Sequence, residues 1–469
     1  MPEFIRRSLL PVSAERLFAW HASPGAFERL ASPLERVRVL ERHGGIGEGD
    51  QTLLEMRVGP FPVQWLAEHR GLVPDHAFTD VQIRGPFAHW SHTHRFEPMG
   101  PEAAILEDMV RYRLPGRGPG NRLAGPWIAR KLARTFAWRH ARTQLDLLRL
   151  QAAGHGKLRV AISGSTGLVG SALAAFLTAG GHEVVPLVRR RDLAGAFWDP
   201  SRLDGEVDRD ALEGLDAVIH LAGENIAGGK WTAARKQVIL DSRRIGTRVL
   251  AEALTRLAKP PKVFISASAI GYYGDGGDTV FDEQTRAAGR GFLSEVSQAW
   301  ELASDPARRA GMRVVNPRLG VVLSPHGGAL ARMLPAFRAG VGGPIGSGKQ
   351  WFSWIGLDDA VGALYHLIGS ELSGPVNLVA PQAVPQGDFA RALGHELGRP
   401  AFLPLHATVV SAIFGEMGHE LLLEGQRVVP SALQADGFQF ATPWLAEALC
   451  WELGGVPGSL ATEAAATAP

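Results

Sequence analysis

The sequence predicts an α/β fold, with a parallel sheet and helices on both faces, preceded by a smaller α+β domain. Up to about residue 150 the apolar residues alternate with polar ones, as Leu54, Met56 and Val58 do, which is typical of half-buried antiparallel strands. From Leu158 onward, apolar strands alternate with helical segments, which indicates a parallel sheet. A glycine-rich turn joins the first of these strands to its helix.

Length and composition narrow the class of protein. With 469 residues, the chain is long enough for about three domains. A net charge of only +2 gives no reason to expect nucleic acid or an anionic membrane as partner, so a small-molecule substrate is favoured. Cys450 is the only cysteine, which excludes an internal disulfide. The sequence contains no uninterrupted apolar stretch of about 20 residues, the length that a membrane-spanning helix needs. We therefore expect a cytoplasmic protein.

The first domain is predicted to be an antiparallel sheet followed by a long helix. After Pro126, the apolar residues Ile128, Leu132 and Phe136 recur at helical spacing. A curved sheet closed by such a helix resembles the START-like (SRPBCC, polyketide-cyclase-like) helix-grip fold. The resemblance implies an apolar cavity and a possible apolar ligand in residues 1–151. The small residues of 152–156 predict a linker.

The second domain opens with a phosphate-binding signature. The apolar strand from Leu158 to Ile162 leads directly into glycines at three-residue spacing and then into a helix. Glycines in this context allow a tight turn and close approach of a dinucleotide pyrophosphate to the helix N-terminus. The predicted cofactor contacts here are Gly164, Ser165, Thr166, Gly167, Leu168, Val169 and Gly170.

The end of the second strand indicates which dinucleotide binds. Proteins that select NAD place an acidic residue there, whereas this chain has Arg189, Arg190 and Arg191. Guanidinium groups suit a 2′-phosphate, so Arg189 and Arg190 favour NADP(H) over NAD. The alternative is a solvated basic turn.

Later segments resemble the extended short-chain dehydrogenase/reductase family, whose Rossmann domain matches the strand and glycine pattern above. The strand that ends at Gly223, the helix with Arg243 and the string from Phe264 to Gly274 carry the resemblance, as does Asn316-Pro-Arg-Leu-Gly320. The resemblance implies cofactor contacts at Leu221, Ala222, Gly223, Glu224, Asn225, Arg243, Ser266, Ala267, Pro317 and Arg318. It also implies a catalytic serine at Ser268.

The chain departs from that family at the catalytic base. The family uses a Tyr with a Lys four residues later, but none of the four tyrosines here has a lysine at that spacing. The corresponding positions are Leu293 and Ser297. An acid or base must come from another group, and the candidates are Ser268, Tyr272, Tyr273 and Glu295.

Together these features resemble an atypical, nucleoside-diphosphate-sugar epimerase-like subgroup of the family. Its pattern implies a Rossmann domain over residues 157–412 and a short helical C-terminal domain over 413–452. The remaining residues, 453–469, are rich in alanine and threonine and are predicted to be disordered. His92 and His94 stand two apart on one predicted strand, but no third ligand is evident, so we assign no metal.

Three hypotheses of function follow. The first is an NADP(H)-dependent oxidoreductase or epimerase that acts on a small hydroxyl or carbonyl compound, possibly a nucleotide sugar. The second is a non-catalytic NADP(H)-binding sensor or scaffold, which the missing base motivates. The third is binding of a lipid-like ligand by the N-terminal domain.

Overall fold

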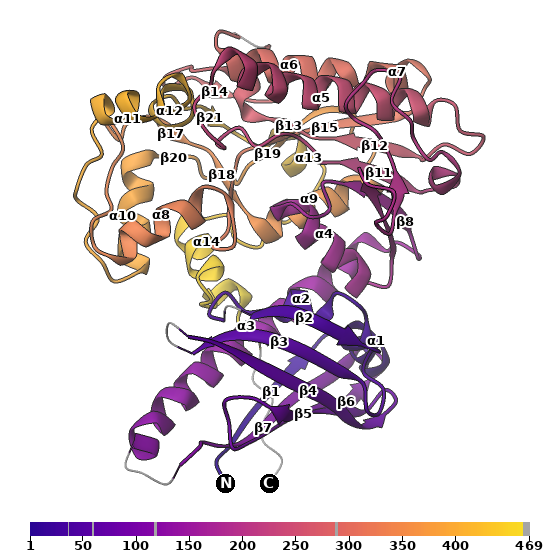
Figure 1. Ribbon diagram of the computed structural model, residues 1–469, viewed down its shortest axis with the longest axis vertical. Coiled ribbons are helices and arrows are strands. Elements are labelled where there is room, and N and C mark those ends of the chain that lie inside the picture. Colours follow the sequence, from indigo (N-terminus) through magenta and orange to yellow (C-terminus); the bar gives the residue numbers. More distant parts are fainter. Residues whose placement is uncertain (36, 59–60, 117–119, 287–288, 463–469) are drawn as a thin grey trace. The chain divides into compact units, whose positions relative to one another are not determined.

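The computed structural model describes residues 1–462 except 36, 59–60, 117–119 and 287–288. They form two compact units: the first consists mainly of residues 1–154, with 175–181 and the segment after 452, and the second of residues 155–174 and 182–452 (Figure 1). In the described part of the chain, no helix combines the length and apolar character that a membrane crossing needs.

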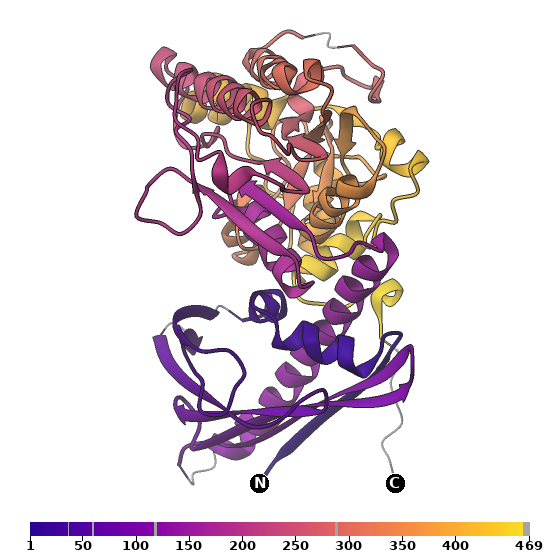
Figure 2. The same ribbon diagram turned by 90° about the vertical axis from the view of Figure 1, so that its right-hand side faces the viewer.

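The first unit is built on an antiparallel sheet of seven strands in the order β1-β7-β6-β5-β4-β3-β2. The strands are β1 (Glu3–Leu10), β2 (Val37–His43), β3 (Gln51–Val58), β4 (Phe61–Val73), β5 (Ala77–Arg84), β6 (His89–Gly100) and β7 (Ala103–Arg113). Its helices are α1 (Ala14–Ala22), α2 (Ala26–Leu30) and α3 (Gly120–Ala153). Figure 2 shows the sheet curving around α3, which confirms the predicted helix-grip fold.

Helix α3 packs on the concave face of this sheet. Leu132 and Phe136 are buried against Val110 and Tyr112 of β7. The helix begins at Gly120, six residues before Pro126, whereas the sequence places its start after the proline. Pro126 therefore lies inside the helix, where its missing N–H costs one backbone hydrogen bond of the helix.

The segment after residue 452 differs from the predicted disorder. Residues 453–462 belong to the first unit and include the short helix η4 (Gly458–Leu460). The Thr462 hydroxyl lies 3.0 Å from Ser8 Oγ and accepts a hydrogen bond from Arg6 at 3.2 Å, so this segment is tied to β1. The rest of the predicted tail, 463–469, lies outside the described residues.

The second unit is built on a parallel sheet of eight strands in the order β10-β9-β8-β11-β12-β15-β13, with β19 also beside β15. Its strands are β8 (Arg159–Ser163), β9 (Glu183–Val188), β10 (Ala196–Phe197), β11 (Ala217–His220), β12 (Val263–Ser266), β13 (Ser268–Ala269), β15 (Arg313–Leu319) and β19 (Gly374–Leu378). From β8 the chain adds strands on one side, then returns to add β11 on the other. This reversal between β8 and β11 is the switch point at which Rossmann folds bind dinucleotides.

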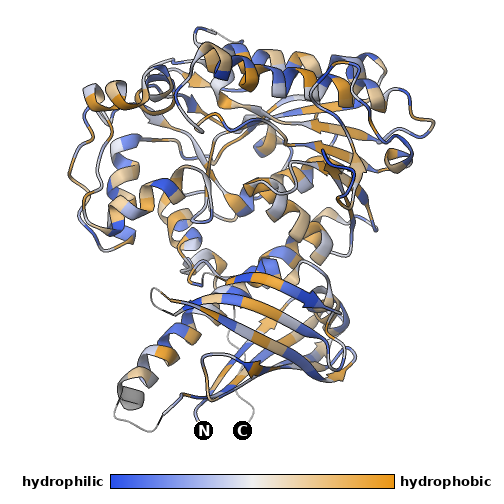
Figure 3. Cartoon of the chain, in the orientation of Figure 1, coloured by the Kyte–Doolittle hydropathy of each residue, from blue (hydrophilic) through white to orange (hydrophobic). Residues whose placement is uncertain are grey.

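Helices cover both faces of the parallel sheet, as predicted. Figure 1 shows α5, α6 and α7 over one face and α4 and α9 over the other. The helices are α4 (Leu168–Ala179), α5 (Ala233–Leu254), α6 (Phe292–Ala303), α7 (Asp305–Arg309), α8 (Gly328–Arg338), α9 (Leu357–Gly369) and α10 (Gln386–Glu396). Figure 3 shows the strands between these layers as largely hydrophobic, which is typical of a sheet buried on both faces.

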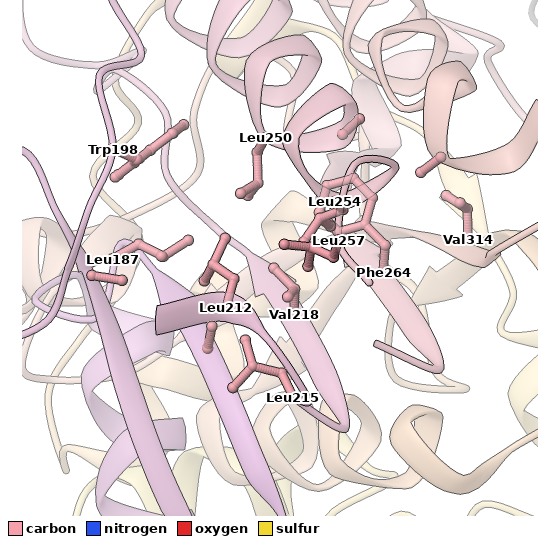
Figure 4. Packing of buried hydrophobic residues seen from close by; sticks show 14 residues of the cluster. Leu187, Trp198, Leu212, Leu215, Val218, Leu250, Leu254, Leu257, Phe264 and Val314 are labelled. Atoms are coloured by element: carbon pink, nitrogen blue, oxygen red, sulfur yellow. The ribbon is translucent and has the colours of Figure 1, made fainter. Parts of the chain in front are cut away.

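The core on the α5 side of the sheet is shown in Figure 4. Val218, Phe264 and Val314 project from β11, β12 and β15 and form one cluster with Leu250 and Leu254 of α5. Four of these five side chains are completely buried and Val314 is 2% exposed. This packing fixes the sheet and α5, and therefore the loops at the carboxyl ends of the strands.

Short elements complete the second unit. They are β14 (Val280–Phe281), β16 (Val321–Leu323), β17 (Trp351–Phe352), β18 (Trp354–Gly356), β20 (Val384–Pro385), β21 (Arg427–Val428), η1 (Asp210–Leu212) and η2 (Ile270–Tyr273). The C-terminal helices are α11 (Ala407–Phe414), α12 (Glu416–Gly418), η3 (His419–Leu423), α13 (Ser431–Ala435) and α14 (Leu445–Glu452).

The predicted C-terminal domain, 413–452, is anchored to the parallel-sheet core. Strand β21 pairs with β14, and Trp451 donates a 2.5 Å hydrogen bond to Asp358 at the start of α9. The neighbouring Asp359 accepts backbone hydrogen bonds from Ala441 and Thr442 at 2.8 and 3.0 Å. These contacts make the segment an integral part of the second unit.

Candidate functional site

The glycine-rich turn after β8 has the backbone that a dinucleotide requires. Gly164 has a φ of +70°, and a Cβ there would lie 3.0 Å from the backbone nitrogen of Ala222. A Cβ at Gly170 would lie 2.1 Å from the carbonyl oxygen of Gly164, so only glycine allows α4 to approach the turn this closely. Thr166 and Gly167 are exposed, and the first-turn N–H groups of α4 have no partners within the helix. The turn therefore fits a pyrophosphate.

The loop after β11 is fixed beside this turn by a buried serine. Ser163 Oγ accepts hydrogen bonds from the N–H groups of Leu221 and Ala222, at 3.1 and 3.2 Å, and shares a hydrogen bond of 2.6 Å with His220 Nδ1. Burial, and next the charge of Arg243, lower the pKa of His220 to about 3, so the imidazole is neutral. The predicted cofactor residues Leu221 and Ala222 thus lie next to Gly164.

Arg243 of α5 lies behind the predicted contact Gly223. A Cβ at Gly223 would lie 3.1 Å from the Arg243 guanidinium carbon, and that guanidinium stacks 4.7 Å from the ring centroid of Trp300. Burial lowers the pKa of Arg243 to about 10, while Glu224 opposes the shift. The N–H of Glu224 donates to Ser242 at 3.0 Å, and Asn225 Oδ1 accepts from the N–H of Ala227 at 2.9 Å.

Several buried polar atoms around these strand ends keep hydrogen-bonding capacity. In the described part of the chain, no partner is found for Ser266 Oγ, Thr247 Oγ1, His220 Nε2 or Trp300 Nε1. Ser266 pairs with His220 across β12 and β11, and the N–H of Ala267 donates to the His220 carbonyl at 2.9 Å. Native proteins leave few such atoms unpaired, which fits a region that receives a polar ligand.

The three arginines after β9 are all exposed but differ in their contacts. Arg190 donates to Asp192 at 3.0 Å, and Arg191 pairs with Glu206 and stacks 4.1 Å from the Phe197 ring centroid. Arg189 has no hydrogen bond or ion pair with any described residue. Of the three, Arg189 is therefore the guanidinium most available to a phosphate.

The catalytic-serine position belongs to a buried polar network. Ser268 donates a 2.7 Å hydrogen bond to Glu301 Oε1. Arg318 binds both oxygens of Glu301, at 2.8 and 2.9 Å, and also donates to the Tyr273 hydroxyl at 3.0 Å. Tyr273 in turn donates to Asn377 Oδ1 at 2.7 Å. One chain of contacts thus joins β13, α6, β15, η2 and β19.

Burial and charge shift the pKa values of Tyr273 and Arg318 within this network. Burial raises the pKa of Tyr273 to about 12, against the opposing effect of Arg318, so its phenol keeps its proton. Burial lowers the pKa of Arg318, but Glu301 outweighs it, and the net pKa is above the usual value. The predicted cofactor contact Arg318 is therefore committed to Glu301 and Tyr273. Pro317, its neighbour, lies buried within β15.

The other predicted catalytic residues separate into two groups. The ring of Tyr272 is partly exposed and lies 3.4 Å beneath the Arg318 guanidinium, so Tyr272 joins the network. Glu295 is exposed, and α6 turns it away from Ser268.

Leu293, Ser297 and Glu301 follow at four-residue intervals along α6, and Cβ of Leu293 and Oγ of Ser297 approach Gly271 of η2. The positions of the missing Tyr and Lys therefore do face η2.

Sequence reasoning missed Glu301 and Asn377. Glu301 lies four residues after Ser297, on the same helical face, and this spacing was the available signal. Asn377 comes from β19, and its Oδ1 and Nδ2 atoms bind Tyr273 and the Val429 carbonyl. No local pattern around Asn377 distinguishes it from other strand residues.

The first unit contains a cavity of about 150 Å³. Its walls are largely apolar and aromatic, with side chains that include Leu54, Met56, Trp65, Trp90 and Phe136. His69, Asp80 and His92 are polar residues of the same wall. The shape agrees with the predicted apolar cavity.

A buried network of histidines and aspartates adjoins this cavity. Asp108 Oδ1 lies 2.9 Å from His92 Nε2 and 2.7 Å from His94 Nδ1, and its Oδ2 lies 2.7 Å from His140 Nε2. Burial lowers the pKa of His94, but Asp108 and Asp80 outweigh it and raise that pKa to about 9. Burial lowers the pKa of His92. Asp80 supplies the third group that the sequence did not reveal beside His92 and His94.

Comparison with family models supports each part of this architecture. Residues 160–378 match the NAD dependent epimerase/dehydratase family, and residues 10–141 match the family described as polyketide cyclase / dehydrase and lipid transport. Residues 407–452 match a domain of unknown function, DUF1731. The predicted combination of three family resemblances is confirmed.

Individual relatives extend this comparison. The crystal structure of the nucleoside-diphosphate sugar epimerase from Corynebacterium glutamicum is 32% identical, has a TM-score of 0.78, and covers 96% of this chain and 90% of its own. The human epimerase family protein SDR39U1, in a crystal structure with NADPH, is 36% identical with a TM-score of 0.56 over 62% of this chain and 98% of its own. An epimerase family protein of Mycobacterium bovis is 47% identical over 62% of this chain and 96% of the relative. The chain therefore belongs to the epimerase family, with an N-terminal helix-grip domain of the polyketide cyclase type.

Proposed function

We propose that the second unit binds NADP(H) and carries out oxidoreduction or epimerisation of a small hydroxyl or carbonyl compound. The turn from Gly164 to Gly170 carries the cofactor part of this proposal, because its backbone conformation suits a pyrophosphate. A residue with a Cβ would be strained at Gly164 and would clash with the turn at Gly170. The human relative solved with NADPH supports the choice of cofactor.

Arg189 supports selection of the 2′-phosphate. It is exposed at the end of β9, where dinucleotide folds bind the adenine ribose, and its guanidinium is uncommitted among the described residues. An arginine in this place forms charge-assisted hydrogen bonds to a phosphate but has no matching partner on the free ribose hydroxyls of NAD. The Arg190–Asp192 pair is exposed, so Arg190 can exchange partners at small cost.

Ser268 is the residue that we assign to proton transfer. When bound, the nicotinamide would supply hydride chemistry at the substrate carbon, and the substrate oxygen must then lose or gain a proton. Ser268 donates its own hydrogen to Glu301, so its oxygen can accept the substrate hydroxyl hydrogen while Glu301 takes the serine hydrogen. Reduction runs the same transfers in reverse. Arg318 holds Glu301 in place from the opposite side.

Turnover by the full chain tests this assignment. Oxidation of NADPH is followed with a panel of aldehydes, ketones and nucleotide sugars, and reduction of NADP with the corresponding alcohols. We expect at least one substrate class to turn over, and Ser268→Ala to lower kcat about 100-fold or more. This variant keeps the Glu301–Arg318 pair and should fold. Glu295→Gln, on the exposed side of α6, should retain activity and serves as the matched control.

One result would contradict the enzymatic assignment, and another would contradict the role of Ser268. Tight NADPH binding with no turnover of the panel or of metabolites in a cell extract favours a sensor or scaffold. Loss of turnover in Tyr272→Phe but not in Ser268→Ala would assign the proton transfer to the partly exposed phenol over which Arg318 lies.

The cavity of the first unit favours a second function, the binding of an apolar ligand. Trp65 and Trp90 lie edge to face, with ring centroids 5.1 Å apart, and with Leu54 and Met56 they form an apolar wall. Native mass spectrometry of the full chain with a fatty-acid and sterol panel tests this function. Leu54→Trp, which fills the cavity, should abolish the adduct, and an adduct that persists at equal abundance would place the ligand elsewhere.

A further inference from the structure

We propose that Asp80, His92 and His94 form a binding site for a divalent transition-metal ion of the Zn²⁺ class on the inner face of the N-terminal sheet. A fourth coordination position of this ion would face the cavity. The site is independent of the dinucleotide function, since all of its residues lie in the first unit.

Strand register places the three ligands on one face. Asp80 of β5 stands directly opposite His92 of β6 in the antiparallel ladder. His94 follows His92 by two residues, so both histidines point to the same side of the sheet. Because two hydrogen-bonded strands, β5 and β6, fix these positions, the ligands are held together without an ion.

The distances fit a metal ion better than they fit hydrogen bonds. Asp80 Oδ2 lies 3.9 Å from His92 Nδ1 and 3.5 Å from His94 Nε2. Good hydrogen bonds between such atoms measure about 2.7 to 3.2 Å. Ligands about 2.1 Å from a tetrahedral ion lie about 3.4 Å apart. The three ligand atoms, all within 4.8 Å of one another, therefore surround a space of ionic size.

The ligand atoms that would not bind the ion are contacted by other polar side chains, as in known metal sites. His92 Nε2 and His94 Nδ1 lie 2.9 and 2.7 Å from the same oxygen of Asp108. On the opposite side, Asp80 Oδ1 lies 2.6 Å from His69 Nδ1. In metal sites, a carboxylate that binds the other ring nitrogen of a ligating histidine fixes the orientation of the imidazole and increases its basicity. Ligating carboxylates are in turn hydrogen-bonded by neighbouring groups. Asp108 and His69 would therefore be the supporting residues of this site.

Ligand type selects the class of ion. Two imidazoles and one carboxylate suit Zn²⁺, Fe²⁺, Co²⁺ or Ni²⁺, whereas Mg²⁺ and Ca²⁺ prefer oxygen ligands throughout. The histidines are only 5% and 6% exposed, while Asp80 and His92 reach the cavity wall. Three protein ligands with one position toward a cavity are typical of zinc sites that bind a further small ligand.

Metal titration of the full chain tests the site. The purified chain is treated with chelator, freed of it by gel filtration and titrated with Zn²⁺ by calorimetry, and with Co²⁺ by visible absorption. We expect one equivalent of Zn²⁺ and a four-coordinate Co²⁺ spectrum. His94→Ala and Asp80→Asn should weaken Zn²⁺ binding about 100-fold or more, and Asp108→Asn about 10- to 100-fold.

Two further variants keep the result decisive. His43→Ala removes an exposed histidine of the same unit and should leave binding unchanged. His94→Cys replaces one ligand by another and should retain binding while adding a thiolate-to-cobalt charge-transfer band. No saturable binding by the wild type, or equal affinity in the wild type, His94→Ala and Asp80→Asn, would overturn the proposal and leave a metal-free hydrogen-bonded network.

Discussion

Ser268 of β13 and Glu301 of α6 are joined by a 2.7 Å hydrogen bond between Oγ and Oε1. The same Oε1 atom accepts a hydrogen bond from Arg318 Nε at 2.8 Å. The serine hydrogen therefore points at Glu301, and its lone pairs remain for another donor. We propose that this relationship supplies the group for proton transfer, since Leu293 and Ser297 stand at the positions predicted for the family's Tyr and Lys.

Gly170→Ala should weaken cofactor binding. The new Cβ would lie 2.1 Å from the Gly164 carbonyl oxygen, and backbone atoms on both sides cannot move away without opening the turn. We expect the affinity for NADPH, measured by calorimetry, to fall about tenfold or more, because the turn N–H groups lose their alignment. Gly156→Ala, where no atom lies within 4 Å of the new Cβ, should bind like the wild type. Equal affinities of the two variants would refute the role of the turn.

Asp146→Asn should destabilise the first unit. Arg29 of α2 binds both oxygens of Asp146 in α3, at 2.6 and 2.7 Å, and the two side chains are 4% and 0% exposed. Removing one charge of a buried pair costs about 3 to 5 kcal/mol. The exposed Arg38–Glu55 pair offers the control, since Glu55→Gln should change the free energy of unfolding by less than about 1 kcal/mol. Chemical denaturation of both variants measures the difference, and equal stability would contradict the assignment.

His220 should make the second unit acid-sensitive. Its pKa in the folded chain is about 3, against about 6.5 when unfolded, so between these values the unfolded chain binds the extra proton and stability falls as the pH falls. From pH 7 to pH 5 this group should remove about 2 kcal/mol from the free energy of unfolding. His220→Asn, whose amide can still accept from Ser163, should show a pH-dependent loss that is smaller by this amount. Parallel pH profiles of the two proteins would show that His220 is not the titrating group.

The cofactor turn could be predicted from the sequence because its constraints are local. A left-handed φ at Gly164 and the contact between Gly170 and Gly164 admit only glycine, so the requirement is visible in the residue types. The strand and helix that flank the turn carry their own apolar patterns. The same argument explains why the Rossmann order of the sheet was predictable from alternating elements.

The polar networks could not be predicted, because they depend on contacts between distant segments. Asp80 lies opposite His92 only because of the register in which β5 pairs with β6. The alternation of residues along each strand shows which side chains share a face but does not determine this register. On α6 the sequence offers both Glu295 and Glu301, and packing against η2 decides that Glu301 reaches Ser268. Thr462 in the predicted disordered tail meets Ser8, a contact that composition cannot reveal.

Calorimetric titration of the full chain with NADPH and with NADH tests the central claim most directly. The wild type should bind NADPH more tightly, and Arg189→Ala should lower the affinity for NADPH about tenfold or more while changing that for NADH by less than about twofold. Arg202→Ala, an exposed arginine paired with Asp204, should change neither. Tighter binding of NADH by the wild type, or equal losses of both cofactors in Arg189→Ala, would contradict an NADP(H) site after β9.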